Sequence, residues 1–89
     1  MKAVITVIGR DMVGILAKVS AVCADHNANI IEVTQSVLQD LFAMIMLCDI
    51  SGLNAPFDGF RDELKELGEN LGISIHVMHE DIFTSMHRI

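Results

Sequence analysis

Residues 9–16 have the sequence Gly-Arg-Asp-Met-Val-Gly-Ile-Leu, and they mark the place where a predicted strand gives way to a predicted helix. Gly9 leaves the backbone free to turn, and Asp11 is a typical N-cap residue whose carboxylate accepts hydrogen bonds from exposed amides. Gly14 falls inside the first predicted helical turn, where a missing side chain lets a ligand or a strand approach the backbone. Because a helix N-terminus presents free amides and a partial positive charge, this turn is a candidate site for the carboxylate of a small molecule.

Strand-like and helix-like patterns alternate around this turn. Residues 2–8 are almost continuously apolar, which is typical of a central strand covered on both faces. Apolar residues at helical spacing over residues 12–26 predict a helix, and Asn27 and Asn29 end it because Asn readily adopts the left-handed conformation. Residues 30–39 alternate between apolar and polar, which predicts an outer strand with one polar face. Its apolar face consists of Ile31, Val33 and Val37.

The second half of the chain repeats this alternation. Residues 40–41 form a tight connection into an apolar run over residues 42–49, which predicts a hairpin. Pro56 suits the first position of the next helix, since its missing N–H would have no helical partner there. Apolar residues repeat at helical spacing over residues 57–71, and Gly72 is well placed to end that helix.

A final strand is predicted over residues 73–79, and a helical tail follows over residues 81–89. The apolar residues of this tail share one helical face: Ile82, Phe83, Met86 and Ile89. The predicted order of strand, helix, strand, strand, helix and strand is that of an α+β fold, the ferredoxin-like βαββαβ sandwich. We therefore expect an antiparallel four-stranded sheet with two helices on one face and a short C-terminal helical tail.

The apolar patterns also predict the order of the strands. The first and third strands are the most continuously apolar, so we expect them at the centre of the sheet. The alternating second strand is expected at an edge, where pairing with a second copy of the chain can extend the sheet. The face without helices is expected to be only partly polar. Its polar residues would be Thr6, Ser74 and His76, and its apolar residues would be Val4, Ile8, Phe42 and Met44.

The composition limits the classes of function. The chain has 89 residues, of which 52% are hydrophobic, so one small domain with a tendency to associate is expected. Its apolar runs are too short to cross a bilayer, and it begins without a signal-peptide pattern, so we expect a cytoplasmic protein and no membrane partner. A net charge of −6 without a cationic cluster argues against nucleic-acid binding. Cys23 and Cys48 lie in apolar runs and are expected to be buried, reduced thiols.

The turn at residues 9–16 also carries a family resemblance. Together with Val19 and the pair Asn29-Ile30 at the start of the second strand, it resembles the pattern of the ACT domain. ACT domains are small regulatory modules attached to many enzymes of amino-acid metabolism. The resemblance covers residues 1–80 as an ACT domain, and residues 81–89 would form a C-terminal helical extension. Small bacterial and archaeal proteins that consist of one ACT domain and a short extension are similar.

The resemblance implies regulatory binding rather than catalysis, and no cofactor. ACT domains commonly pair side by side through edge strands and bind an amino acid at the junction. In this chain the matching ligand-binding positions are Asp11, Gly14, Ile15 and Asn29. Asp11 stands where several ligand-binding members have Asn, and an aspartate receives an ammonium group but repels a carboxylate. The resemblance thus implies a homodimer or larger homo-oligomer with an amino acid between its subunits.

Simpler interpretations stay open for the same residues. Asp11 can be only a helix cap, Gly14 can serve close packing, and Asn29 can be a residue that ends the helix. The ligand-binding interpretation depends on their occurrence at the same end of one helix. An alternative function is a dimerisation or protein-interaction module without a small ligand, whose surface and tail contact a partner enzyme or regulator.

Catalytic and metal sites are not predicted. The serine residues have no evident acid-base partner, and the carboxylates of the second helix form a solvated face. Three histidines, His76, His79 and His87, invite a metal site with Glu80 or Asp81. Residues three apart on a strand point to opposite faces, however, so the first two histidines would diverge.

Overall fold

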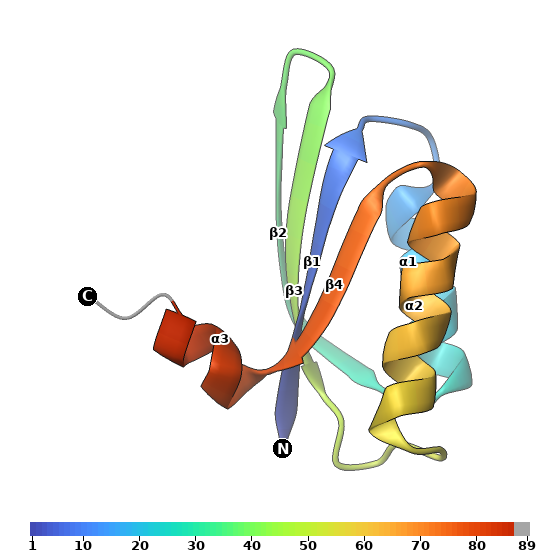
Figure 1. Cartoon of the computed structure of the whole chain (residues 1–89), viewed down its shortest axis with the longest axis vertical. Coiled ribbons are helices and arrows are strands. Elements are labelled where there is room, and N and C mark those ends of the chain that lie inside the picture. The colour runs from blue at the N-terminus through green and yellow to red at the C-terminus, as the bar shows by residue number, and fades with distance from the viewer. Residues whose placement is uncertain (87–89) are drawn as a thin grey trace.

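The computed structural model describes residues 1–86, which form a sheet with helices on both of its faces. The elements in chain order are β1 (Lys2–Arg10), α1 (Ile15–Asp25), β2 (Asn29–Leu38), β3 (Leu41–Asp49), α2 (Phe57–Leu71), β4 (Ser74–His79) and α3 (Glu80–Met86). The strands pair in the order β2-β3-β1-β4, and every pairing is antiparallel. Helices α1 and α2 cover one face, whereas α3 lies on the other (Figure 1). The predicted βαββαβ order and the central positions of β1 and β3 are confirmed.

The core lies between the sheet and the pair α1 and α2. Alternate residues of β1 point into it, and the strand registers place buried residues of β3 and β4 beside them. The strand residues of this core are Ala3, Ile5, Val7, Phe42, Met44, Met46, Cys48, Ile75 and Val77. Phe60 and Leu64 from α2 are fully buried against them. Each large apolar side chain removed from water in this way stabilises the fold by about 1.5–3 kcal/mol.

The face of the sheet without α1 and α2 differs from the prediction at two positions. Phe42 pairs with Gly9 and Met44 pairs with Val7, so both side chains point toward the helices and are buried. The neighbouring residue Ile45 pairs with Thr6 and occupies the opposite face instead. The prediction for Phe42 and Met44 was wrong because β3 is apolar at successive positions, which gives no indication of which face each side chain occupies.

The edge strand β2 contains a β-bulge that the alternating pattern did not predict. The register shifts between Ile30 and Glu32, so Ile31 is the extra residue. Ile30 therefore packs against the core, and Val33 pairs with Met46 on the same, helix-side face. The hairpin of β2 and β3 extends beyond the helices (Figure 1). On the edge strand β2, Val33 is 38% exposed and Val37 is 53% exposed.

The connections differ from the predictions by a residue or two. The hairpin turn uses Gln39, which has a positive φ of 58°, so β3 already begins at Leu41. Pro56 is the N-cap of α2 and not its first helical residue. Gly72 ends α2 as predicted, with a φ of 73° and its amide donating to the carbonyl of Glu69.

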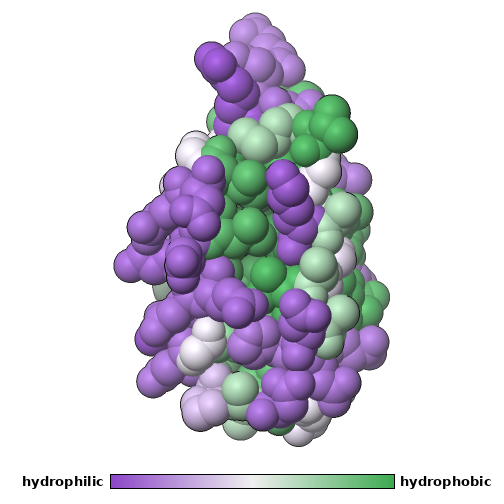
Figure 2. Space-filling view, turned by 90° about the vertical axis from the view of Figure 1, so that its right-hand side faces the viewer, coloured by the Kyte–Doolittle hydropathy of each residue, from purple (hydrophilic) through white to green (hydrophobic). Residues whose placement is uncertain are grey.

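Polar residues cover the outer surface of α2, whereas the exposed residues of α1 include Leu16, Ala17, Ala21 and Ala24. Figure 2 shows the helical side of the molecule, where a band of apolar side chains runs lengthwise between two stretches of polar ones. On α2, Arg61 forms ion pairs of 3.5 Å with Asp58 and with Asp62. No helix within residues 1–86 combines the length and the apolar character needed to cross a membrane.

The loop after β3 makes one acid-sensitive contact. The carboxylate of Asp49 accepts a hydrogen bond of 2.9 Å from the Ser51 amide, and this bond lowers the pKa of Asp49 below its usual value of 3.8. A lowered pKa in the folded state stabilises the fold above the usual value, and this stabilisation is lost as the pH falls through the lower folded pKa.

We therefore expect Asp49→Asn to flatten the dependence of unfolding free energy on pH below pH 3.8. Urea titrations at a series of acidic pH values measure this. Ser51→Ala keeps the amide donor and is expected to retain most of the wild-type dependence. An identical acid profile for Asp49→Asn and wild type would contradict the assignment.

Candidate functional site

The turn between β1 and α1 is tied to the tip of the neighbouring hairpin. The amide of Asp11 donates a 2.9 Å hydrogen bond to the carbonyl of Asp40. Arg10 Nε lies 3.9 Å from the Asp40 carboxylate, and both side chains are exposed, so this ion pair adds little stability. The backbone hydrogen bond therefore fixes the start of the turn at Asp11, while the residues after Asp11 project from the end of the sheet.

The predicted N-cap role of Asp11 was wrong. Helix α1 begins at Ile15, and its N-cap is Gly14, which has φ 89° and ψ 9°. No side chain forms a cap hydrogen bond, because Asp11 lies too far before the helix and its backbone is held by the hairpin. Its exposed carboxylate is thus not used by the helix and points into solvent beside the turn.

Gly14 is required for its conformation rather than for packing. A Cβ atom built on it would meet no atom within 4 Å, whereas its positive φ strains any other residue. Close packing against a strand is therefore not the reason for this glycine within the chain. Open space adjoins the N-terminus of α1, whose first amides have no partner inside the helix. The preceding residue, Val13, is 98% exposed.

The other two predicted site residues occupy different surroundings. Ile15 is buried in the core, so only its backbone amide is available to a ligand. Asn29 is exposed and begins β2, where it pairs with Asp49. It follows the C-terminus of α1, and the 11 residues of this helix span about 16 Å. One chain therefore does not bring Asn29 to Asp11, and the expectation that they share one end of the helix was wrong.

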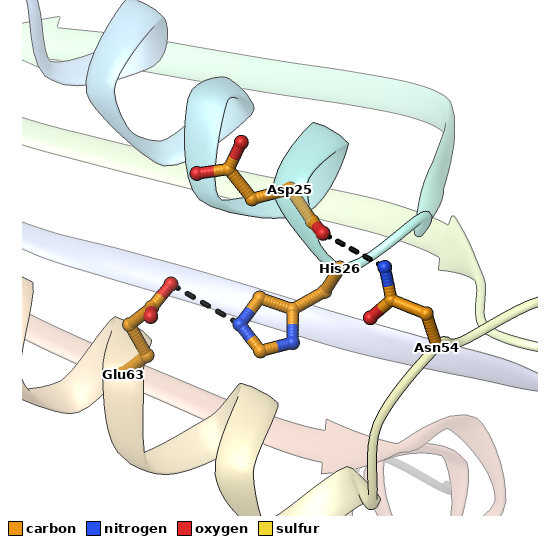
Figure 3. A network of polar contacts seen from close by, with 4 residues as sticks. All are labelled: Asp25, His26, Asn54 and Glu63. Carbon is orange, nitrogen blue, oxygen red and sulfur yellow. Dashed lines mark hydrogen bonds and ion pairs between the residues drawn. The ribbon is translucent and has the colours of Figure 1, made fainter.

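A polar network at the C-terminal end of α1 was missed by sequence reasoning (Figure 3). His26 Nε2 lies 3.1 Å from a carboxylate oxygen of Glu63 on α2, and the imidazole packs against the ring of Phe60. Asn54 donates a 2.9 Å hydrogen bond to the carbonyl of Asp25. His26 falls on the apolar stripe of the predicted helix, and a polar group there needs a partner. The sequence therefore indicates that His26 needs a polar partner, but it does not indicate that this partner is Glu63.

This network fixes the segment that leads to Asn29. His26 is the C-cap of α1, and Asn27 follows in the left-handed conformation with φ 61°, as predicted. Asn27 also donates a 2.8 Å hydrogen bond to the carbonyl of Gly52. These contacts hold the start of β2 against α2 and against the loop between β3 and α2.

The remaining candidate groups do not converge. His76 points away from the helices, whereas His79 stacks on Phe57 at a ring distance of 4.3 Å on the helical side. Within residues 1–86, no three His, Cys, Asp or Glu side chains are grouped to hold a metal ion. His87, proposed as a third ligand, and Ile89, assigned to the apolar face of the tail, lie outside the described residues.

The two cysteines are free and buried, as predicted. They face each other from α1 and β3, and a hydrogen bond with the Cys48 side chain, together with burial, raises the pKa of the Cys23 thiol. A buried thiol that stays protonated is a poor nucleophile, so Cys23 has the chemistry of a core residue.

Comparison with known proteins agrees with this architecture. A family model described as "ACT domain" matches residues 2–78. A UPF0237 protein of Methanopyrus kandleri is 50% identical over 88 residues, which are 99% of this chain and 98% of that protein.

Solved structures share the fold as well. An ACT domain protein from Streptococcus pneumoniae superposes with a TM-score of 0.79 and 36% identity, covering 93% of both chains. The regulatory subunit of aspartate kinase from Thermus thermophilus has a TM-score of 0.67 at 20% identity, and the match covers 86% of this chain and 50% of that one. The second likeness is one of fold alone.

Proposed function

Because the chain belongs to the ACT domain family of regulatory ligand-binding modules, we propose that it binds a small amino acid between two copies of itself. The domain acts without catalysing a reaction. It responds to the concentration of the amino acid and passes that response to its own assembly or to a partner enzyme or regulator.

The start of α1 supplies two complementary groups for an amino acid. The free amides at Ile15 and the residues after it can donate hydrogen bonds to a carboxylate, and the helix dipole favours a negative charge there. The carboxylate of Asp11, which the helix does not use, is suited to an ammonium group. A Cβ atom at Gly14 would meet no atom within 4 Å, so open space adjoins the start of the helix. The observation that carries the proposal is the open start of α1, where no side chain caps the helix and Asp11 belongs to the same turn.

A second copy is needed to bring Asn29 to this site. Two copies joined along β2 by a two-fold axis run antiparallel at their shared edge. The N-terminal end of α1 in one copy then lies toward the C-terminal end of α1 in the other. In that arrangement, Asn29 of the second copy approaches the turn that carries Asp11, and the amide side chain closes the site.

The surface along β2 has the composition of an interface. Exposed apolar residues lie on the helix-side face of β2 and on the outer side of α1. Strand β2 is also an edge of the sheet, with unpaired backbone groups. The exposed apolar residues are Val33, Val37, Leu16, Ala17, Ala21 and Ala24. We name this set the β2–α1 surface, and it is the surface that a second copy would cover.

Ligand binding at such a junction would regulate by differential affinity. An amino acid that contacts both copies binds the dimer more tightly than the separate chains, so it shifts the population toward the dimer. A partner that binds a surface present only in the dimer, or only in the single chain, then responds to this shift.

Calorimetric titration with each of the twenty amino acids tests the ligand. We expect one or a few to bind, and we expect Asn29→Ala to weaken binding about tenfold through loss of a hydrogen bond to a charged group. Asn70→Ala, which removes an exposed amide from α2, is the matched control and should bind like wild type. Absence of binding by all twenty at millimolar concentration would contradict the ligand proposal.

A ligand-free dimerisation module is the second candidate function, and the apolar β2–α1 surface is the observation that favours it. It predicts the same dimer, but with a dissociation constant that no amino acid changes. Sedimentation velocity with and without the amino acids separates the two functions.

A further inference from the structure

A groove lies on the face of the sheet opposite to α1 and α2. Helix α3 follows β4 at one end of the sheet and projects from this face (Figure 1), and the space between α3 and the sheet has a volume of about 520 Å³. Pockets that hold small molecules fall in the same range of volume. The apolar walls are formed by Ile8, Ile45, Met78, Phe83 and Met86.

Two polar side chains meet on the floor of this groove. Thr6 of β1 and His76 of β4 are directly opposite in the strand register, so their side chains point into the groove side by side. A threonine hydroxyl and an imidazole N–H can both donate hydrogen bonds. Although the chain has a net charge of −6, none of the described residues that line the groove is acidic.

From this arrangement we propose that the groove is a second ligand site, which binds a small, mainly apolar monocarboxylate. The carboxylate accepts hydrogen bonds from Thr6 and His76, and the apolar body of the ligand lies against Met78 and Met86. Binding covers apolar surface that is otherwise in water, since Ile8 is 51% and Met86 65% exposed. Helix α3 forms one wall of this site, and the ligand holds this wall to the sheet.

The shape of the groove favours a small molecule over a second copy of the chain. Helix α3 contacts β1 and β4 and projects from this face, so it interrupts the flat sheet surface that another sheet would need. No residue of α3 is buried, so the helix has room to adjust to a bound molecule. The groove and the β2–α1 surface lie on different sides of the sheet, so the two sites are open at the same time.

Nuclear magnetic resonance of the full chain with ¹³C-labelled methionine methyl groups tests this proposal, with 4-phenylbutyrate as the probe. We expect the methyl signals of Met78 and Met86 to shift in a saturable manner. Met46, which lies in the core on the helical side of the sheet, serves as the internal control and should not shift. The amine 4-phenylbutylamine carries the opposite charge and should bind more weakly.

Two matched variants assign the polar contact. Thr6→Val keeps the shape of the side chain and removes the hydroxyl, and we expect it to weaken probe binding about fivefold. Thr34→Val makes the same change on the same sheet face of β2, outside the groove, and should bind like wild type. The ¹³C spectrum without probe shows whether each variant is folded.

Three results would overturn the proposal. The first is absence of a saturable shift at Met78 and Met86 at millimolar probe concentration. The second is equal affinity for the probe in both folded threonine variants. The third is a change of the same two methyl signals on dilution without probe, together with dissociation in sedimentation velocity, which would assign the groove to a second copy of the chain.

Discussion

Gly9→Ala is expected to destabilise the fold by about 3 kcal/mol, because the added methyl group has no space. A Cβ atom at Gly9 would lie 2.4 Å from Cγ2, 2.7 Å from Cβ and 3.1 Å from Cα of Ile73. The last contact involves backbone, so a change of side-chain rotamer cannot relieve it. The end of β1 and the start of β4 would have to separate, which breaks the pairing of the adjacent residues. Urea denaturation measures the loss.

Gly68 of α2 also packs closely against Ile73. A Cβ atom there would lie 2.8 Å from the carbonyl oxygen of Ile73, so Gly68→Ala is also expected to destabilise the fold. Gly59 in the same helix is the matched control, since its Cβ position has no neighbour within 4 Å. Gly59→Ala should instead stabilise the fold by about 0.5–1 kcal/mol through helix propensity.

A double variant checks the cause at Gly9. Ile73→Ala removes the atoms beyond Cβ that crowd an alanine at position 9, so the two substitutions together should cost less than the sum of their separate effects. Strict additivity, or a single variant Gly9→Ala with wild-type stability, would contradict the packing argument.

The fold was predictable where a sequence feature is compatible with only one kind of local structure. Continuous apolar character identified β1 and β3 as central strands, and Asn27 and Gly72 marked helix ends through their left-handed conformation. The bulge at Ile31 was not predictable, because an inserted residue leaves the local alternation of the strand intact. The face occupied by Phe42 depends on its pairing with Gly9. This pairing cannot be deduced from the amino-acid composition of β3.

The candidate site was only partly predictable, because it depends on where the ends of α1 lie. The turn before the helix and its glycine are evident from sequence, but the hydrogen bond from Asp11 to Asp40 is a long-range contact that removes Asp11 from the cap position. Asn29 comes after the helix and Asp11 before it, so chain direction alone separates them. The contact between His26 and Glu63 joins residues 37 apart, and only the packing of α1 on α2 determines it.

The homodimer proposed above should separate into single chains when charge is placed on the β2–α1 surface. Val37→Glu on β2 and Ala21→Glu on α1 each put a carboxylate where a second copy would exclude water, without disturbing the core, since both residues are exposed. Because the interface is two-fold, each substitution introduces two such charges. We expect the dissociation constant to rise at least about a hundredfold for either variant.

Sedimentation velocity over a range of protein concentrations measures this change. Ser74→Glu at the start of β4 places the same charge on the opposite edge of the sheet, so it should leave the dimer intact. If the amino acid bridges two copies, the Val37→Glu chain should also lose amino-acid binding, although its own Asp11 and Gly14 are unchanged. A variant that stays dimeric, or a monomeric variant that still binds with wild-type affinity, would show that the ligand site does not depend on pairing along β2.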